Sequence, residues 1–340
     1  MEFQLHKTFP VELAAEWNAL LDESVTHVPF LRYEYLDAWW QTRGGGEWPQ
    51  AELAIVTARQ GGALVGVAPL FFATNRQGKP ALLLLGSIEV SDYLDLIARP
   101  ADLDQFTREL LPFLAGAALP PWQELDLYNL FDSSPTLAAL EAAGKAQGWS
   151  YSCEPLQQAP YIPLPGDWET YLAGIDKKQR HEIRRKMRRA EEMGAAVQVR
   201  FAADPERFAA DVEDFMALMA QDPEKNAFLT PAMRQHMRLV TRCAFEQGCL
   251  QLAFLEINGE KAAAYLSFDY LERMWVYNSG VDRRFIEYSP GWVLLGHLLK
   301  WANEQKRSEF DFMRGNEDYK YRFGAIDRHV VRAVLSKKSL

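Results

Sequence analysis

The stretch that decides the fold runs from residue 249 to residue 303 and reads CLQLAFLEINGEKAAAYLSFDYLERMWVYNSGVDRRFIEYSPGWVLLGHLLKWAN. It opens with an alternating apolar run that stops at Asn258-Gly259. Asn-Gly between two alternating runs is typical of a β-hairpin, because both residues accept a positive φ. Further strand-like runs cover Lys261–Tyr270 and Met274–Gly280. The sequence therefore predicts a three-stranded antiparallel meander.

A helix is predicted directly after the meander. Ser289-Pro290-Gly291 supplies a serine N-cap followed by a proline, which is typical of a helix start. The residues that follow are apolar at helical spacing: Trp292, Leu295, Leu298, Leu299 and Ala302. The first amides of such a helix are open to an anion, and two arginines lie just upstream.

A second motif follows this helix. A strand is predicted over Glu309–Met313, and Arg314–Gly324 reads RGNEDYKYRFG. The order S-P-G, a helix with Trp-Ala, and F-D-F-x-R-G-x-E-x-Y-K-x-x-F-G resembles the CelD-like acetyltransferase group of the GNAT superfamily, which is related to the Fem-type aminoacyltransferases. The resemblance implies an α+β (mixed α/β) fold of two tandem GNAT-like domains, each a mixed, mostly antiparallel sheet flanked by helices.

The chain is long enough for two domains, with 340 residues of which 48% are hydrophobic. The order of hairpin, strand, helix and strand occurs twice, and a proline-rich segment at residues 159–166 separates the copies. We therefore predict domains at residues 1–158 and 159–340, with residues 1–40 helical. Asp102 precedes the helix of the first copy, where an acid repels phosphate. The second copy is accordingly assigned to acyl-CoA, and the degenerate first copy to the substrate.

The resemblance implies an acyl-CoA, with acetyl-CoA the first choice, as co-substrate and no metal. GNAT proteins polarise the thioester with backbone amides of the strand before the helix, which here is Met274–Gly280. We expect the cofactor to contact Arg283, Arg284, Ser289, Gly291, Trp292, Tyr277 and Asn278. We expect the substrate to contact Asp92, Tyr93, Arg184, Arg188, Tyr265 and Arg314. Two alternatives to ligand contact remain open. Ser289 can simply cap the helix, and the aromatic residues can belong to the core.

Acyl transfer from a thioester needs a base for the incoming nucleophile and an acid for the departing thiolate. The predicted catalytic residues are Glu317 as the base, Tyr319 as the acid and Lys320 as the stabiliser of negative charge. The role of Lys320 rests on the resemblance, because Fem-type relatives place a lysine in a similar aromatic-Lys-x-x-Phe-Gly ending by the transfer site. The alternative is that Glu317 and Lys320 form a surface ion pair.

Residues 177–189 form a basic run with eight lysines and arginines. On a helix, one stripe carries Lys177, Arg180, Arg184 and Arg188, while Ile183 and Met187 face inward. Two interpretations of this stripe remain open. It can be a solvated face, or it can bind an anionic substrate or the 3′-phosphate of CoA.

Net charge and hydropathy narrow the functional class. The net charge of −9 argues against a DNA-binding protein and also against tRNA as a partner. The basic run, in contrast, would suit tRNA. No signal peptide and no apolar run of the ~20 residues that span a bilayer is present, so we expect a cytoplasmic protein. HExxH and GxSxG motifs are absent.

Three functions therefore remain. The first is an acyl-CoA-dependent acyltransferase, an N-acetyltransferase or a related enzyme, acting on an amine or hydroxyl of a small molecule or a glycan precursor of the cell envelope. The second is a Fem-type enzyme that uses aminoacyl-tRNA. The third is a non-catalytic binding module, which stays open because the usual Arg/Gln-x-x-Gly-x-Gly/Ala loop is represented here by Arg284 and Gly291 alone.

Overall fold

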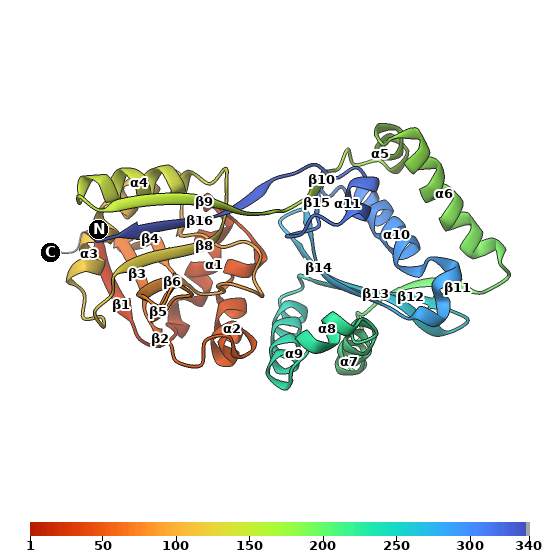
Figure 1. Ribbon diagram of the computed structural model, residues 1–340, viewed down its shortest axis with the longest axis horizontal. Coiled ribbons are helices and arrows are strands. Elements are labelled where there is room, and N and C mark those ends of the chain that lie inside the picture. Colours follow the sequence, from red (N-terminus) through yellow and green to blue (C-terminus); the bar gives the residue numbers. More distant parts are fainter. Residues whose placement is uncertain (338–340) are drawn as a thin grey trace. The chain divides into compact units, whose positions relative to one another are not determined.

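The computed structural model describes residues 1–337, without the side chains of residues 190 and 191, and divides into two units. Unit 1 comprises Met1–Gln158 and the C-terminal segment from Arg328, and unit 2 comprises Ala159–Asp327. Each unit combines mixed, mostly antiparallel sheets with flanking helices, as the sequence predicted (Figure 1). The predicted second domain included the C-terminal segment from Arg328, whereas in the structure this segment belongs to unit 1.

Unit 1 contains two sheets. The first has the order β1 (Glu2–His6), β3 (Ile55–Gln60), β4 (Ala63–Ala68) and β7 (Ile97–Ala98). The second has the order β2 (Glu52–Leu53), β5 (Leu70–Thr74), β6 (Pro80–Leu84), β8 (Glu124–Phe131), β16 (His329–Ser336) and β9 (Ser150–Gln158). The helices are η1 (Val11–Leu13), α1 (Ala14–Asp22), η2 (Pro29–Leu31), α2 (Tyr33–Gly46), α3 (Leu103–Gly116) and α4 (Pro135–Ala146). The helical prediction for residues 1–40 missed β1, which pairs with β3.

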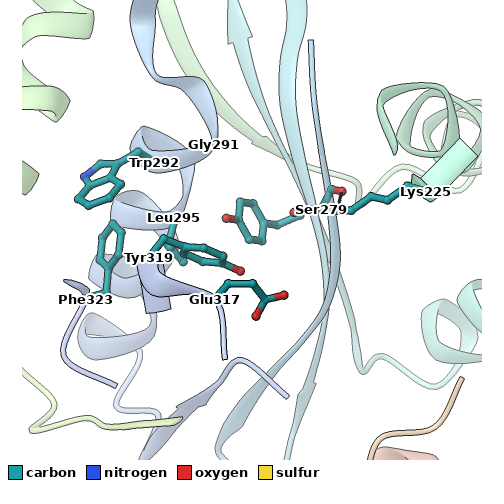
Figure 2. Close-up of a pocket in the computed structure, with 9 residues that line it drawn as sticks. Lys225, Ser279, Gly291, Trp292, Leu295, Glu317, Tyr319 and Phe323 are labelled. Atoms are coloured by element: carbon teal, nitrogen blue, oxygen red, sulfur yellow. Dashed lines mark hydrogen bonds between the residues drawn. The ribbon is translucent and has the colours of Figure 1, made fainter. Parts of the chain in front are cut away.

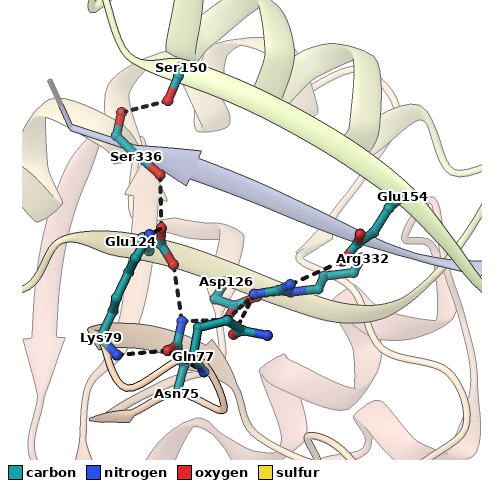
Figure 3. A network of polar contacts seen from close by, with 9 residues as sticks. All are labelled: Asn75, Gln77, Lys79, Glu124, Asp126, Ser150, Glu154, Arg332 and Ser336. Carbon is teal, nitrogen blue, oxygen red and sulfur yellow. Dashed lines mark hydrogen bonds and ion pairs between the residues drawn. The ribbon is translucent and has the colours of Figure 1, made fainter.

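The last strand closes the second sheet of unit 1. β16 pairs antiparallel with both β8 and β9. Arg332 on β16 forms a two-pronged ion pair with Asp126 of β8, with Nε–Oδ1 and Nη2–Oδ2 distances of 2.7 and 2.9 Å (Figure 3). Asp126 is fully buried, so this pair holds the strand strongly in place. The chain thus completes unit 1 only after all of unit 2 has been traversed.

Unit 2 contains one sheet of six strands. Their order is β10 (Tyr161–Pro163), β15 (Glu309–Asp311), β14 (Arg273–Val281), β13 (Glu260–Tyr270), β12 (Leu250–Ile257) and β11 (Val197–Phe201). Helices cover both faces (Figure 1). One face carries α5 (Trp168–Gly174), α6 (Lys177–Glu192) and α10 (Pro290–Glu304), and the other carries α7 (Phe208–Met219), α8 (Pro223–Phe228) and α9 (Pro231–Glu246). The remaining helical segments are η3 (Arg283–Tyr288) and α11 (Asp318–Arg322).

The predicted meander is confirmed as β12, β13 and β14. Asn258 and Gly259 make the tight turn, with φ values of 52° and 82°. β14 pairs with β13 along its length, with a bulge at Tyr277, but it pairs with β15 over only three residues, from Arg273 to Trp275. Beyond Trp275, no strand of the described chain pairs with this edge of β14. The sheet therefore opens there, and backbone groups of β14 become available to a ligand.

The two units repeat one arrangement. In unit 1, β6 is antiparallel to β5 and parallel to β8, and α3 lies between β6 and β8 in the chain. In unit 2, β14 is antiparallel to β13 and parallel to β15, and α10 lies between β14 and β15 in the chain. The internal repeat that the sequence predicted is therefore present in the structure.

The basic helix packs through the face that the sequence predicted. Ile183 is fully buried, and Met187 packs against Gly296 of α10. A Cβ at Gly296 would lie 2.8 Å from the Met187 sulfur, so a larger residue here would displace the Met187 side chain. The charged residues of α6 are left on its outer sides.

Candidate functional site

A cavity of about 290 Å³ lies in unit 2, beside the part of β14 that is not paired with β15 (Figure 2). Its walls come from α8, β13, β14, the start of α10 and the segment around α11. The lining residues are Lys225, Tyr265, Ser279, Gly291, Trp292, Leu295, Glu317, Tyr319 and Phe323. The structure therefore brings two predicted catalytic residues, Glu317 and Tyr319, together with two predicted cofactor residues, Gly291 and Trp292.

The start of α10 borders this cavity. Pro290 has no N–H, and Val293 donates to the carbonyl of Ser289, so the amides of Gly291 and Trp292 have no acceptor within the helix. Ser289 has a left-handed backbone, with φ 51° and ψ 51°, and its side chain makes no capping hydrogen bond, unlike the expected serine cap. A helix start that is not capped by its own side chain is suited to an anion.

The side chains of Tyr319 and Glu317 extend into the same part of the cavity (Figure 2), and Tyr265 also lines it. Burial raises the pKa of Tyr265 above its ordinary value. Burial also raises the pKa of Tyr319, and the charges of Tyr265 and Glu317 add to that shift. Both phenols therefore stay protonated at neutral pH and act as hydrogen-bond donors. The Glu317 side chain is 58% exposed, so its carboxylate is accessible from solvent.

Lys320 holds the loop that carries Glu317. Its side chain is 3% exposed and its ammonium does not line the cavity. Nζ donates to the carbonyls of Arg314 and Gly315 at 3.1 and 2.9 Å and lies 2.8 Å from a carboxylate oxygen of Glu317. An ammonium has three protons, and these three partners account for them. This geometry favours a role for Lys320 in positioning Glu317. The ion pair between Glu317 and Lys320 that the sequence left open is present, but its lysine end is buried.

Lys225 is a cavity residue that the sequence did not predict. Its Nζ donates to the carbonyl of Ser279 on the open edge of β14, at 2.5 Å. Burial lowers the pKa of its ammonium, and the charges of Asp222 and Glu317 partly offset this. Asp222 caps α8 through the amides of Glu224 and Lys225, and this Asp-Pro start was the available sequence signal for the helix. No local pattern shows that α8 reaches a strand more than 50 residues away.

Several predicted cofactor residues lie outside the cavity lining. Arg284 is bound by Asp282 at 2.8 Å and by Glu260 at 2.9 Å, in a different hollow. Arg283 is exposed on η3. Tyr277 packs edge-on against Phe268, with ring centroids 5.7 Å apart, and the Asn278 side chain accepts from the amide of Ser279.

The remaining predicted substrate residues are also separated from the cavity. Tyr93 is fully buried in unit 1 and stacks on Phe131 at 4.3 Å, and Asp92 precedes it in the same unit. Arg184 and Arg188 are exposed on α6 and pair with Glu169 and Glu192. Arg314 takes part through its backbone carbonyl, as the acceptor of Lys320.

Residues 177–321 match the family model described as the acetyltransferase (GNAT) domain. The chain carries a GNAT domain. This domain lies within unit 2 and contains every lining residue of the cavity except Phe323, so the predicted GNAT superfamily is confirmed for this part of the chain. No curated protein matches the sequence.

Solved structures resemble this chain over nearly its whole length. The structure of FemX shares 12% identity at a TM-score of 0.70, covering 98% of this chain and 97% of that one. L-PGS from Bacillus licheniformis shares 14% at 0.57, covering 97% and 93%. The C-terminal domain of a putative lysylphosphatidylglycerol synthetase from Agrobacterium fabrum shares 10% at 0.56, covering 95% and 91%. At identities this low, the structural likeness establishes a shared fold and no more.

Two negative findings apply to the described residues. No group of three or more His, Cys, Asp or Glu side chains there is placed to hold a metal ion. Within the same residues, every helix is too short or too polar to cross a membrane.

Proposed function

We propose that this GNAT protein transfers an acyl group from a coenzyme A thioester to an amine or hydroxyl in the cavity of unit 2. The observation that carries the proposal is the uncapped start of α10, which opens beside a carboxylate and two protonated phenols. A helix start of this kind suits the diphosphate of coenzyme A, and the acid and base that acyl transfer requires lie in the same cavity.

The residues at the start of α10 fit a coenzyme diphosphate. The backbone amides of Gly291 and Trp292 have no acceptor within the helix, so both can donate to phosphate oxygens. Lys186 of α6 lies 4.1 Å from the centroid of the Trp292 ring and adds positive charge nearby. A Cβ at Gly291 would lie 3.1 Å from a methyl group of Val281, so glycine allows the start of α10 to pack closely against β14. When bound, the coenzyme supplies the activated acyl group.

In this proposal, different residues of the cavity act as the base and the acid. Glu317 removes a proton from the attacking amine or hydroxyl, and Tyr319 gives its proton to the departing sulfur. The new bond joins the acyl carbon to nitrogen or oxygen, and the carbon–sulfur bond breaks. The proton held by Glu317 restores Tyr319, so the net transfer is from acceptor to thiol. We assign the binding of the acyl oxygen, as it develops charge, to backbone amides of β14 beyond Trp275, where β15 no longer pairs with the strand.

The acceptor side of the cavity is formed by Lys225 and Ser279, from α8 and β14. We propose an acetyl donor and a small-molecule or glycan-precursor acceptor. We also propose that the donor binds unit 2 rather than unit 1. In unit 1, α3 begins after Asp102, and a carboxylate at that position disfavours a phosphate.

The test is a transfer assay with purified protein, acetyl-CoA and a panel of amine and hydroxyl acceptors, read by mass spectrometry of the products. We expect an acetylated product and one free CoA for each transfer, with Glu317→Gln strongly impaired. An absence of saturable acetyl-CoA binding by calorimetry would remove the donor and leave a binding module.

Aminoacyl transfer from tRNA is the second candidate. The structural likeness to a putative lysylphosphatidylglycerol synthetase and the basic surface of α6 favour it. The same protein is incubated with radiolabelled aminoacyl-tRNA and the acceptor panel. Label that moves from tRNA to an acceptor, without any transfer from acetyl-CoA, would replace the first proposal with this one.

A further inference from the structure

A second hollow lies in unit 2 between α6 and α11. It measures about 650 Å³, which is larger than the cavity beside β14 and within the usual range for ligand pockets. The lining residues are Lys178, Gln179, His181, Glu182, Arg185 and Arg322. The lining contains two arginines, one lysine and one carboxylate, so the hollow is basic in a protein whose net charge is −9.

The basic character follows from the packing of α6. Ile183 and Met187 face α10, and residues 178, 181, 182 and 185 lie together on the opposite side of α6, where they share the hollow with Arg322 of α11. Glu182 is engaged by Arg185 at 2.8 Å, and Arg322 pairs with the highly exposed Asp318 at 2.7 Å. Lys178 makes no ion pair with a carboxylate of the described residues. Asp176 uses its carboxylate on the amides of Lys178 and Gln179 at the start of α6.

Two elements connect this hollow to the cavity beside β14. The short helix α11 directs Tyr319 into the cavity, while Arg322 lines the hollow. Phe323 stacks on Trp292 at 4.5 Å, and Lys186 of α6 covers the same indole. The hollow and the cavity are thus lined by consecutive residues of the chain, Arg322 and Phe323. A ligand anchored at the start of α10 has a second basic site close by.

We propose that the hollow between α6 and α11 binds a phosphate ester at the far end of the acyl donor. This inference rests on the proposed function, in which the ester is the 3′-phosphate of coenzyme A. Arginine and lysine are the side chains that bind phosphate by charge-assisted hydrogen bonds. Lys178 and Arg322 come from different elements and would hold the phosphate from two sides, while Glu182 stays paired with Arg185.

The structure places this site on a different flank of α6 from the stripe that the sequence singled out. Arg184 and Arg188 pair with Glu169 and Glu192 and do not line the hollow. These two arginines therefore supply a matched control, since they lie on the same helix and carry the same charge.

The test compares the binding of CoA and of 3′-dephospho-CoA by calorimetry, which does not depend on turnover. The wild-type protein is expected to bind CoA about tenfold more tightly than dephospho-CoA, the size of one charge-assisted contact. Lys178→Gln with Arg322→Gln is expected to abolish this preference while dephospho-CoA binding stays unchanged. Arg184→Gln with Arg188→Gln is expected to keep the preference. Equal affinity of the wild type for the two ligands, or equal losses in both double variants, would overturn the assignment to CoA.

A second arm separates the phosphate site from the choice of donor. If the wild type binds neither CoA nor dephospho-CoA, the coenzyme proposal fails, and the same variants are titrated with deacylated tRNA at 50 and 200 mM salt. Weaker tRNA binding in the Lys178/Arg322 pair alone would support the hollow as a phosphate site for a tRNA donor. Unchanged tRNA binding, or no binding at all, would overturn the hollow as well.

Discussion

Replacing Lys320 with methionine distinguishes a positioning lysine from one that acts on the acyl group. Methionine fills the space of the aliphatic stem but removes the ammonium. Two backbone carbonyls, of Arg314 and Gly315, then lose their donor, and Glu317 loses its counter-charge. The loop that carries Glu317 would relax away from the cavity, so activity and stability should fall together.

The size of the stability loss follows from the buried end of this network. An unsatisfied carbonyl costs about 1–3 kcal/mol when water cannot reach it, and the Lys320 side chain is 3% exposed. Glu317 is 58% exposed, so its share is small. We therefore expect Lys320→Met to destabilise unit 2 by about 2–4 kcal/mol. For a unit of this size, that corresponds to a fall in Tm of about 5–15 °C.

The assay is thermal unfolding followed by circular dichroism, with turnover measured on the same preparations. Glu317→Gln is the matched control, because it keeps an oxygen for Lys320 but cannot accept the proton. This control should unfold within about 1 kcal/mol of the wild type and lose at least about 10²-fold in kcat. A Lys320→Met protein with unchanged Tm and strongly reduced kcat would refute the positioning role and restore the direct one.

Three further outcomes are expected. Tyr319→Phe should lower kcat by about 10²-fold with little change in KM for the donor, and an unchanged kcat would remove its role as the acid. Lys225→Met should raise KM for the acceptor at least threefold and leave donor affinity as it was, whereas a loss of donor affinity would place Lys225 on the other side of the reaction. His236 is fully buried in α9, and burial lowers its pKa from 6.5 to about 4. The unfolded chain therefore binds more protons between those values, so stability should decline by about 3 kcal/mol as the pH falls from 6.5 to 4, and a His236→Gln variant that keeps the same pH dependence in urea unfolding would contradict this.

Local patterns predicted the elements of unit 2 that end in tight turns or caps. Asn258-Gly259 fixed the hairpin because few other residues accept two positive φ values in succession. The proline at the start of α10 and the apolar spacing after it predicted the helix that borders the cavity. These signals depend on neighbours in the chain, so they are readable without the fold.

Long-range pairing was not readable in the same way. β16 joins β8 and β9 through Arg332 and Asp126, which are 206 residues apart, and nothing local names that partner. The serine at position 289 resembled a side-chain cap, but its left-handed backbone turns the chain into α10 instead. Lys225 and the burial of Lys320 depend on which elements pack together. Patterns in the sequence therefore located the segment that we propose to be catalytic. The arrangement of the side chains within it required the structure.

The most direct test of the central claim is a crystal structure of this protein with bound coenzyme A. The account predicts diphosphate oxygens about 2.7–3.2 Å from the amide nitrogens of Gly291 and Trp292, with the thiol directed toward Glu317 and Tyr319. A coenzyme whose diphosphate lies elsewhere, with the start of α10 occupied by solvent, would contradict it.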